Sequence, residues 1–409
     1  MIKEKYIQRT KETALNVLQT QVESLRKKDV TKTGLRLYKD GHIGVSGALG
    51  KYDEAELEQR AQDALGLQVP YDLKVSQDNK QTMEICPDLI SEQDFPAEME
   101  AMLAELRKEQ PKFSFSNKIK LTEREISLVN DKDLDLRFKD RLISMELVIK
   151  EKASANLFDA FSGYIGRSYE RREFLRLTND ICNAYQNPVD LPQGEKMPVV
   201  FSTSDLLPLK QVIMDLNGQS FGTGSSLLAG KAGQQVFNEN FTLYQNHNPE
   251  DSIQPFFDAE GVVNPDYRYT LIDKGKVVTP YTDKKTAAQY NLPLTGSAKA
   301  EYDAVPTLDF TSCKIQESEK TLKELLQGQM AVFVLVASGG DFTPSGDFGT
   351  PVQLAFLFDG ERLIGKLPPL QLSANVFSMY GEDFIGVGKN SLYTLGKEKY
   401  MIMNMKVSQ

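Results

Sequence analysis

The longest pattern in the sequence is an alternation of apolar and polar residues that runs through residues 113–160. Successive side chains of a β-strand point to opposite faces of a sheet, so a period of two indicates strands and not helices. Residues 130–133 interrupt the alternation with the polar sequence Asn-Asp-Lys-Asp, which is typical of a turn. The sequence therefore predicts long antiparallel strands, and any fold for this chain must supply partners for them.

Helices and a hairpin are predicted around these strands. In residues 3–28, apolar side chains recur at helical spacing, which predicts an amphipathic helix. The pair Asp40-Gly41 between two alternating runs predicts a β-hairpin over residues 34–49. Further helices are expected at residues 53–67, 96–108 and 169–185.

A polar stretch with proline and glycine, residues 186–196, separates this half from a second half that is richer in glycine and in short strands. The chain has 409 residues, more than the roughly 250–300 over which a single core keeps growing, so two domains are expected. The predicted fold class is α+β. An N-terminal domain of mixed α and β structure with an antiparallel sheet would span residues 1–190, and a β-rich C-terminal domain residues 191–409.

The sequence argues against two kinds of partner, nucleic acid and a membrane. The 48 Lys and Arg residues against 57 Asp and Glu residues give a net charge of −9, which repels a phosphate backbone, so no nucleic acid is expected. No run reaches the roughly 20 apolar residues that cross a bilayer, and the first residues lack the apolar segment of a signal peptide. A cytoplasmic protein without membrane contact is expected.

Three cysteines and two histidines limit the available chemistry. Cys86, Cys182 and Cys313 lack a CxxC spacing, which predicts reduced thiols, and the apolar patterns around the last two predict burial. His247 is expected in an exposed loop and His42 in the hairpin. A nucleophilic Cys313–His247 pair stays open, because such partners meet in space and not along the chain.

Two further motifs favour turns over binding sites. The glycine-rich residues 218–233 lack the phosphate-loop pattern, since Ala232 follows Gly230-Lys231, and left-handed turns are predicted there. Asp258 and Glu260, at positions i and i+2, could face a cation from one strand side. Without a third ligand in the sequence, a turn is the preferred interpretation.

Short motifs follow one another in a characteristic order, mostly in the second half. They lie at residues 34–47, 195–200, 225–233, 257–261, 271–277, 286–287, 294–297, 341–348 and 360–363. In this order they resemble the TldD/PmbA family. The resemblance implies an α+β N-terminal domain, a β-rich C-terminal domain and a dimer, whose TldD-type member is a zinc peptidase that degrades unstructured peptides.

In the TldD-type member, an H-E-x-x-x-H helix and a late cysteine supply the metal ligands. Here Gln211, Val212 and Leu216 stand where the two histidines and the glutamate would be expected, and no cysteine follows Cys313. These side chains cannot reproduce a zinc shell of histidines. The chain therefore resembles the PmbA or TldE branch, and no metal, catalytic residue or other cofactor is expected.

The leading hypothesis is a noncatalytic subunit of a TldD-type zinc metallopeptidase that acts in proteolysis or maturation of unfolded peptides. Its expected partners are a TldD-type subunit or a second copy of the chain, and an unfolded peptide. Thr295 and Gly296 are the candidate peptide-binding residues, because glycine beside a β-branched residue permits close backbone approach. The alternatives are a stand-alone homodimeric peptide-binding protein without proteolytic activity and an enzyme with a Cys/His site. The apolar strand at residues 400–405 is expected to be covered by subunit pairing.

Overall fold

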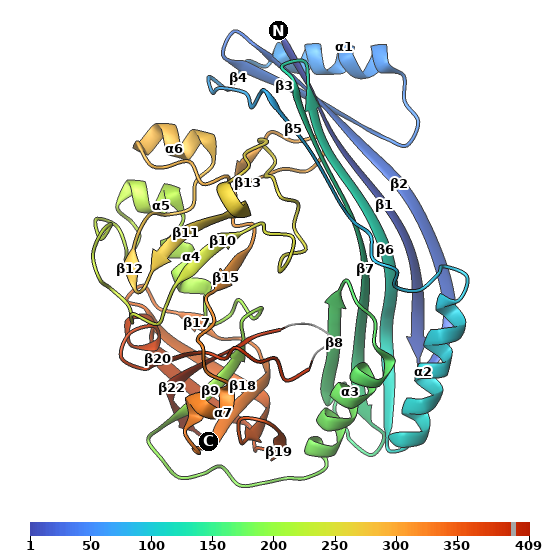
Figure 1. Cartoon of the computed structure of the whole chain (residues 1–409), viewed down its shortest axis with the longest axis vertical. Coiled ribbons are helices and arrows are strands. Elements are labelled where there is room, and N and C mark those ends of the chain that lie inside the picture. Colours follow the sequence, from blue (N-terminus) through green and yellow to red (C-terminus); the bar gives the residue numbers. More distant parts are fainter. Residues whose placement is uncertain (394–397) are drawn as a thin grey trace.

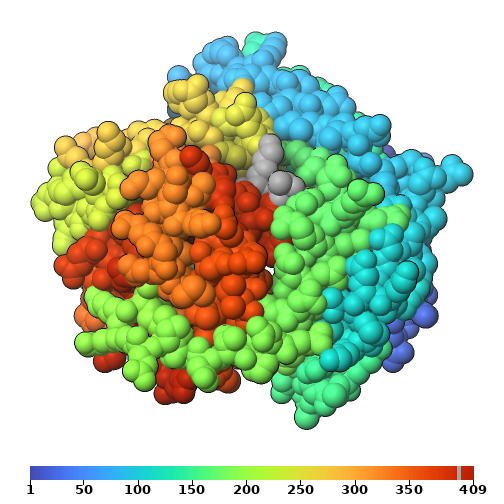
Figure 2. All heavy atoms as spheres, turned by 60° about the horizontal axis from the view of Figure 1, so that its bottom comes forward, coloured from blue at the N-terminus to red at the C-terminus, as the bar shows by residue number. Residues whose placement is uncertain are grey.

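The structure is a computed structural model that describes residues 1–393 and 398–409. Figure 1 shows a long, curved N-terminal sheet standing beside a C-terminal half of shorter strands. After the last N-terminal helix the chain crosses the underside of the C-terminal half, as Figures 1 and 2 show from two sides. The expected boundary at residue 190 falls in this crossing segment. The fold is α+β, with a β-rich C-terminal half.

The N-terminal sheet has eight strands in the order β4-β3-β2-β1-β6-β7-β5, with β8 also paired to β7. The two long alternating segments form β6 and β7, which pair antiparallel as predicted, and Asp133 makes the turn between them with a φ of 60°. The strands are β1 (Ile2–Leu18), β2 (Gln21–Lys39), β3 (His42–Leu49), β4 (Val69–Pro70), β5 (Asn79–Ile85), β6 (Phe113–Asn130), β7 (Leu134–Glu151) and β8 (Ala160–Gly166).

The helix predicted over residues 3–28 is wrong, because this segment forms β1 and the first part of β2. β1 pairs with β2 on one side and with β6 on the other. The turn between β1 and β2 consists of Gln19 and Thr20, with φ of 48° and 63°. Residues other than Gly, Asn and Asp rarely adopt such angles, so no turn is visible in the sequence. Leu18 and Leu25, on the predicted helical stripe, are 48% and 44% exposed.

The predicted hairpin and the other three N-terminal helices are confirmed. Asp40 and Gly41, both with positive φ, join β2 to β3. α1 (Glu54–Leu65) begins after Asp53, whose side chain caps the backbone N–H groups of the first turn, and it packs on β3. α2 (Phe95–Glu109) and α3 (Arg171–Tyr185) cover the other end of the sheet (Figure 1).

The C-terminal half contains an eight-stranded sheet, a four-stranded sheet and a two-stranded sheet. The large sheet runs β16-β9-β22-β20-β18-β17, with β19 on β18 and β21 on β22, and the four-stranded sheet runs β12-β11-β10-β15. Its strands are β9 (Lys196–Ser202), β10 (Leu243–Asn246), β11 (Arg268–Asp273), β12 (Lys276–Val277), β13 (Ala298–Lys299), β14 (Thr307–Leu308), β15 (Cys313–Ile315), β16 (Ala331–Ala337), β17 (Asp341–Phe342), β18 (Asp347–Phe358), β19 (Leu363–Lys366), β20 (Leu370–Asn375), β21 (Phe384–Val387) and β22 (Tyr400–Ser408). The short helices are α4 (Lys210–Asp215), α5 (Gly218–Thr223), η1 (Pro265–Tyr267), α6 (Lys284–Tyr290), α7 (Leu322–Leu326) and α8 (Val376–Met379).

The apolar C-terminal strand is not an open edge. β22 pairs with β9 over seven residues and with β20 and β21 as well, so it lies inside the large sheet. The argument that a second subunit must cover this strand is therefore wrong, because neighbouring strands of the same chain already satisfy its backbone. Dimer formation stays a prediction.

One apolar cluster joins the two halves. Phe95 of α2 and Phe174 of α3 belong to the same buried cluster as Phe333 of β16 and Phe356 of β18. The two halves therefore share part of their core and do not form separate bodies. Among the helices of the described residues, none is long and apolar enough to cross a membrane.

Candidate functional site

The helix that would carry zinc ligands is α4 and the residue after it. Val212 and Leu216 are 1% and 0% exposed and pack in an apolar cluster of the C-terminal half. The Gln211 amide donates to Asp215 Oδ2 at 2.8 Å, and Asp215 Oδ1 accepts the Leu227 N–H at 2.7 Å. Gln211 thus binds within the helix, and Asp215 also connects the helix to the loop after α5. Two apolar side chains and an amide do not fit a zinc ion.

No other group replaces the missing ligands in the part of the chain that the structure describes. Among residues 1–393 and 398–409, no cluster of three or more His, Cys, Asp or Glu side chains could hold a metal. The glycine-rich segment after α5 makes left-handed turns at Gly224, Gly230 and Gly233, as predicted.

His247 is buried, which corrects the expectation of an exposed loop residue. The ring is 5% exposed, with Nδ1 2.7 Å from the Pro255 carbonyl and Nε2 2.8 Å from Thr311 Oγ1. Its backbone N–H also donates to the Tyr267 carbonyl. This hydrogen bond continues the pairing of β10 with β11 by one residue past the end of β10. Burial lowers the pKa of this imidazole.

The thiols give no support to a Cys/His site. Burial raises the pKa of Cys313 and of Cys182 to about 12, which disfavours the reactive thiolate, and Cys86 is exposed. Both ring nitrogens of His247 already have other partners. His42, the other histidine, is partly buried at the start of β3.

Asp258 and Glu260 lie in a turn, the interpretation that the D-A-E-G sequence favoured, and both side chains are buried. Asp258 Oδ1 accepts the N–H groups of Glu260 and Val262, both at 2.9 Å, and Oδ2 accepts the Ala298 N–H at 3.0 Å. Glu260 Oε1 accepts the Tyr71 hydroxyl at 2.8 Å. Each carboxylate therefore accepts hydrogen bonds from the chain itself.

The burial of this turn changes how its groups titrate. Burial raises the pKa of Asp258 to about 6. Burial, together with the charge of Asp258, raises the pKa of Glu260 to about 7. Lys284 in α6 lies beside them, and burial lowers the pKa of its ammonium group. The cluster thus contains groups that titrate near neutral pH.

A buried ion pair ties this turn to the N-terminal sheet. Arg36 of β2 is fully buried and donates to Glu4 Oε1 at 3.1 Å and to the Ala259 carbonyl at 2.6 Å. The Tyr38 hydroxyl donates to the same Glu4 oxygen at 2.8 Å. Sequence reasoning missed this cluster. The only signal was that Glu4 and Arg36 occupy inward positions of strands, and β1 was interpreted as a helix.

Thr295 and Gly296, the candidate peptide-binding residues, are both buried. The Thr295 carbonyl accepts from Gln245 Nε2 at 3.0 Å and from Asn264 Nδ2 at 2.7 Å. Gly296 has a φ of 70°, and a Cβ there would lie 2.8 Å from Val262 Cγ1. These residues hold the loop between α6 and β13 against the buried turn. Their peptide-binding role stays a prediction.

A pocket of about 460 Å³ lies in front of that loop. It opens between residues 73–79, the turn at residues 261–262 and α6. Leu294, which precedes Thr295, forms part of its wall. The lining consists of Leu73, Lys74, Val75, Ser76, Gln77, Asn79, Leu134, Gly261, Val262, Lys284, Ala287, Ala288 and Leu294.

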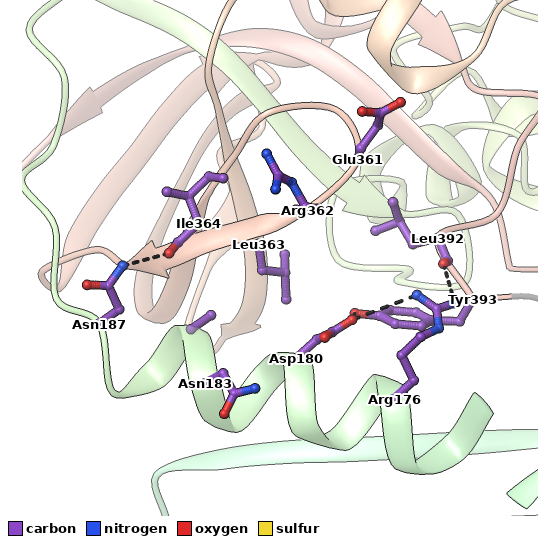
Figure 3. Close-up of a pocket in the computed structure, with 11 residues that line it drawn as sticks. Arg176, Asp180, Asn183, Asn187, Glu361, Arg362, Leu363, Ile364, Leu392 and Tyr393 are labelled. Atoms are coloured by element: carbon purple, nitrogen blue, oxygen red, sulfur yellow. Dashed lines mark hydrogen bonds and ion pairs between the residues drawn. The ribbon is translucent and has the colours of Figure 1, made fainter. Parts of the chain in front are cut away.

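A second, smaller pocket of about 250 Å³ lies between α3 and β19, at the seam of the two halves (Figure 3). Its charged groups bind one another and the chain. Arg176 donates to the Leu392 carbonyl at 3.0 Å and lies 3.8 Å from Asp180, which accepts from the Tyr393 hydroxyl at 3.4 Å. Asn187 donates to the Ile364 carbonyl at 2.8 Å. Arg176 and Asp180 of this pocket are therefore already paired with each other and with the chain.

The whole fold is similar to three solved structures. TldE from Thermococcus kodakarensis has a TM-score of 0.81 and 18% identity, covering 100% of this chain and 97% of that one. Proteins from Thermotoga maritima and Bacteroides thetaiotaomicron, each named as a candidate modulator of DNA gyrase, have TM-scores of 0.80 and 0.77 at 15% identity. They cover 100% of this chain and 96% and 94% of their own. At these identities the likeness shows the fold.

Sequence comparison places the chain in a family. The uncharacterized protein MJ0231 of Methanocaldococcus jannaschii is 24% identical over 161 residues, which span 38% of this chain and 37% of that relative. The model of the PmbA/TldA metallopeptidase C-terminal domain matches residues 194–407, more than half of the chain. Together with the motifs along the sequence, this match shows that the chain belongs to the PmbA/TldD metallopeptidase family.

Proposed function

We propose that this chain is a PmbA/TldE-like noncatalytic subunit of a TldD-type zinc metallopeptidase, acting in the cytoplasm in proteolysis or maturation of unfolded peptides. The observation that carries the proposal is the composition of α4 in a metallopeptidase family. Gln211, Val212 and Leu216 cannot hold a zinc ion, and two of them are core residues. The hydrolytic step therefore belongs to a partner subunit.

An exposed apolar surface on β8 and the loop before it supports a partner or peptide contact. Phe161 and Ile165 lie on one face of the strand and are 37% and 52% exposed, and Leu157 and Phe158 are 96% and 50% exposed. Clustered apolar side chains on a surface mark interaction sites. Among the described strands β8 pairs with β7 alone, so an extended peptide could add to its other edge.

In this proposal Thr295 and Gly296 remain candidate peptide-binding residues. Because both are buried, they would act through Leu294 and Val262, which they hold at the wall of the larger pocket. A peptide bound there would lie against the buried turn that joins the two halves.

The test combines the chain with a TldD-type partner and a disordered peptide. The chain alone should not cleave, and the mixture should show zinc-dependent cleavage that chelators abolish. Ile165→Asp should reduce this cleavage, while Leu67→Asp, at an apolar residue 76% exposed near α1, serves as the matched control and should not. If the partner cleaves equally well with this chain absent, the proposal is wrong. Peptide binding without any effect on cleavage would favour the stand-alone peptide-binding protein.

A further inference from the structure

The larger pocket has a chemical character that the proposed subunit role does not explain. Most of its wall is apolar, with Leu73, Val75, Leu134, Val262 and Leu294 among its residues. Its volume of about 460 Å³ lies in the range of roughly 300–1,000 Å³ that is typical of small-ligand sites. The pocket can therefore enclose a side chain or a small organic group.

The charges of the lining have one sign. Among the described residues, the lining contains Lys74 and Lys284 and no aspartate or glutamate, although the chain carries a net charge of −9. An apolar pocket with only cations in its wall is complementary to an apolar group that ends in a carboxylate.

Lys284 is positioned to bind such a carboxylate. Its Nζ donates to Ser76 Oγ at 2.9 Å and to the Glu260 carbonyl at 3.1 Å, and both partners are neutral. An ammonium group has three hydrogens, and within residues 1–393 and 398–409 the third has no acceptor. Ser76 and Lys284 both line the pocket, so the hydrogen-bonded pair that they form is part of the pocket wall.

We infer that this pocket binds the carboxyl-terminal residue of a peptide, with the apolar side chain against Leu294 and Val262 and the carboxylate on the Lys284 ammonium. The peptide as source of the carboxylate rests on the proposed function. A charge-assisted hydrogen bond to a group removed from water is stronger than a neutral one. The backbone of an internal peptide segment offers no such charge, so the pocket favours an apolar residue at the chain end over the same residue inside a peptide.

The nearby acidic groups set the pH range of binding. Glu260 and Asp258 face Lys284 from the buried turn, Tyr71 bonds Glu260, and the Arg36–Glu4 pair lies behind them. A bound carboxylate is repelled by ionised Glu260, whose pKa is raised to about 7 by burial. Binding should therefore tighten as the pH falls from 8 to 6, as long as the ligand carboxylate stays ionised.

Calorimetry with the isolated full chain tests the inference. The probes are an acetylated tripeptide that ends in leucine with a free carboxylate, the same tripeptide as its amide, and octanoate. The free acid should bind roughly tenfold more tightly than the amide, because the amide lacks the charge. This comparison uses the unaltered protein and needs no variant.

Three variants locate the site. Lys284→Met should remove the preference for the acid, and Lys285→Met, the exposed neighbour outside the lining, should retain it. Ala288→Phe should fill the pocket and abolish binding. Equal affinity for acid and amide, or an unchanged preference in Lys284→Met, would overturn the inference. Binding of octanoate without the tripeptide would overturn the peptide as ligand. None of these measurements involves a partner, so they succeed or fail separately from the cleavage test.

Discussion

At the level of single residues, the turn at Asp258 and Glu260 places two carboxyl groups in the interior of the protein. Both carboxyl groups have pKa values raised by burial, to about 6 and about 7. In the unfolded chain these groups return to ordinary values near 4. Between about pH 4.5 and 7 the folded state therefore binds more protons than the unfolded state, and the free energy of unfolding falls as the pH rises.

Glu260→Gln should remove part of this pH dependence. Relative to the variant, the wild type should lose on the order of 2 kcal/mol of unfolding free energy between pH 5 and 8, measured by denaturant titration. Glu319→Gln, at an exposed glutamate, is the matched control and should follow the wild type. Parallel curves for the wild type and Glu260→Gln would show that Glu260 is not a proton-binding group in this range.

Residue patterns predicted the turn at Asp258 but not the burial of His247. The D-A-E-G sequence contains its own turn chemistry, because Asp258 accepts from backbone groups two and four residues ahead. His247 is buried by partners that lie elsewhere in the chain, Thr311 among them. Contacts with residues far away along the chain cannot be predicted from the residues that flank a histidine in sequence.

At the level of elements, the strands with long alternating runs and the capped helices were predictable, and β1 and β2 were not. β6 and β7 alternate in long runs that change phase once, after Leu121 and after Leu142, and Asp53 caps α1 with its own side chain. β1 also changes phase, from Glu4 and Tyr6 to Thr13 and Leu15, and its alternating buried runs are shorter than those of β7. Apolar residues of β1 are then spaced three and four residues apart, as in an amphipathic helix. The segment is a strand because it pairs with β6, which lies far away in the sequence.

The element α4 gives a prediction about metal. The isolated protein should contain no stoichiometric zinc by elemental analysis after purification without a metal-affinity tag. Restoring the motif with Gln211→His, Val212→Glu and Leu216→His together should lower stability by about 3 kcal/mol or more, because two polar groups enter an apolar core.

Gln211→His alone is the control for that experiment, since Gln211 is only partly buried and its change should be tolerated. One equivalent of tightly bound zinc in the wild type would contradict the noncatalytic role. A stable triple variant would contradict the packing of α4 described above.

At the level of the whole molecule, the two halves are joined by contacts that no local pattern shows. Gly34 and Gly47 of the predicted hairpin lie under Tyr302 and Asp303, and a Cβ on Gly34 would lie 1.6 Å from the Tyr302 carbonyl oxygen. These glycines permit the close approach of a loop from the C-terminal half. The hairpin was predictable. Its contact with the loop at Tyr302 and Asp303 was not, because about 270 residues of chain separate the two segments.

Asp140 of β7 is the charged centre of another such junction. It is fully buried and accepts from Arg124 at 2.7 Å and from Arg167 at 2.8 Å. Arg124 and Arg167 also donate to the Ile253 and Pro249 carbonyls of the C-terminal half. One carboxylate thus holds two guanidinium groups that reach across the junction.

Asp140→Asn keeps the shape of the side chain and removes its charge, so it should leave two mostly buried arginines without a counter-ion. We expect a loss of about 2–4 kcal/mol in the free energy of unfolding, and faster amide hydrogen exchange at residues 249–253. The matched control is Asp135→Asn on the same strand, where Asp135 pairs with a surface Arg137 and the expected loss is below about 1 kcal/mol. If both variants lose the same stability and residues 249–253 exchange as in the wild type, the junction does not depend on the Asp140 charge, and the shared apolar core alone holds the two halves together.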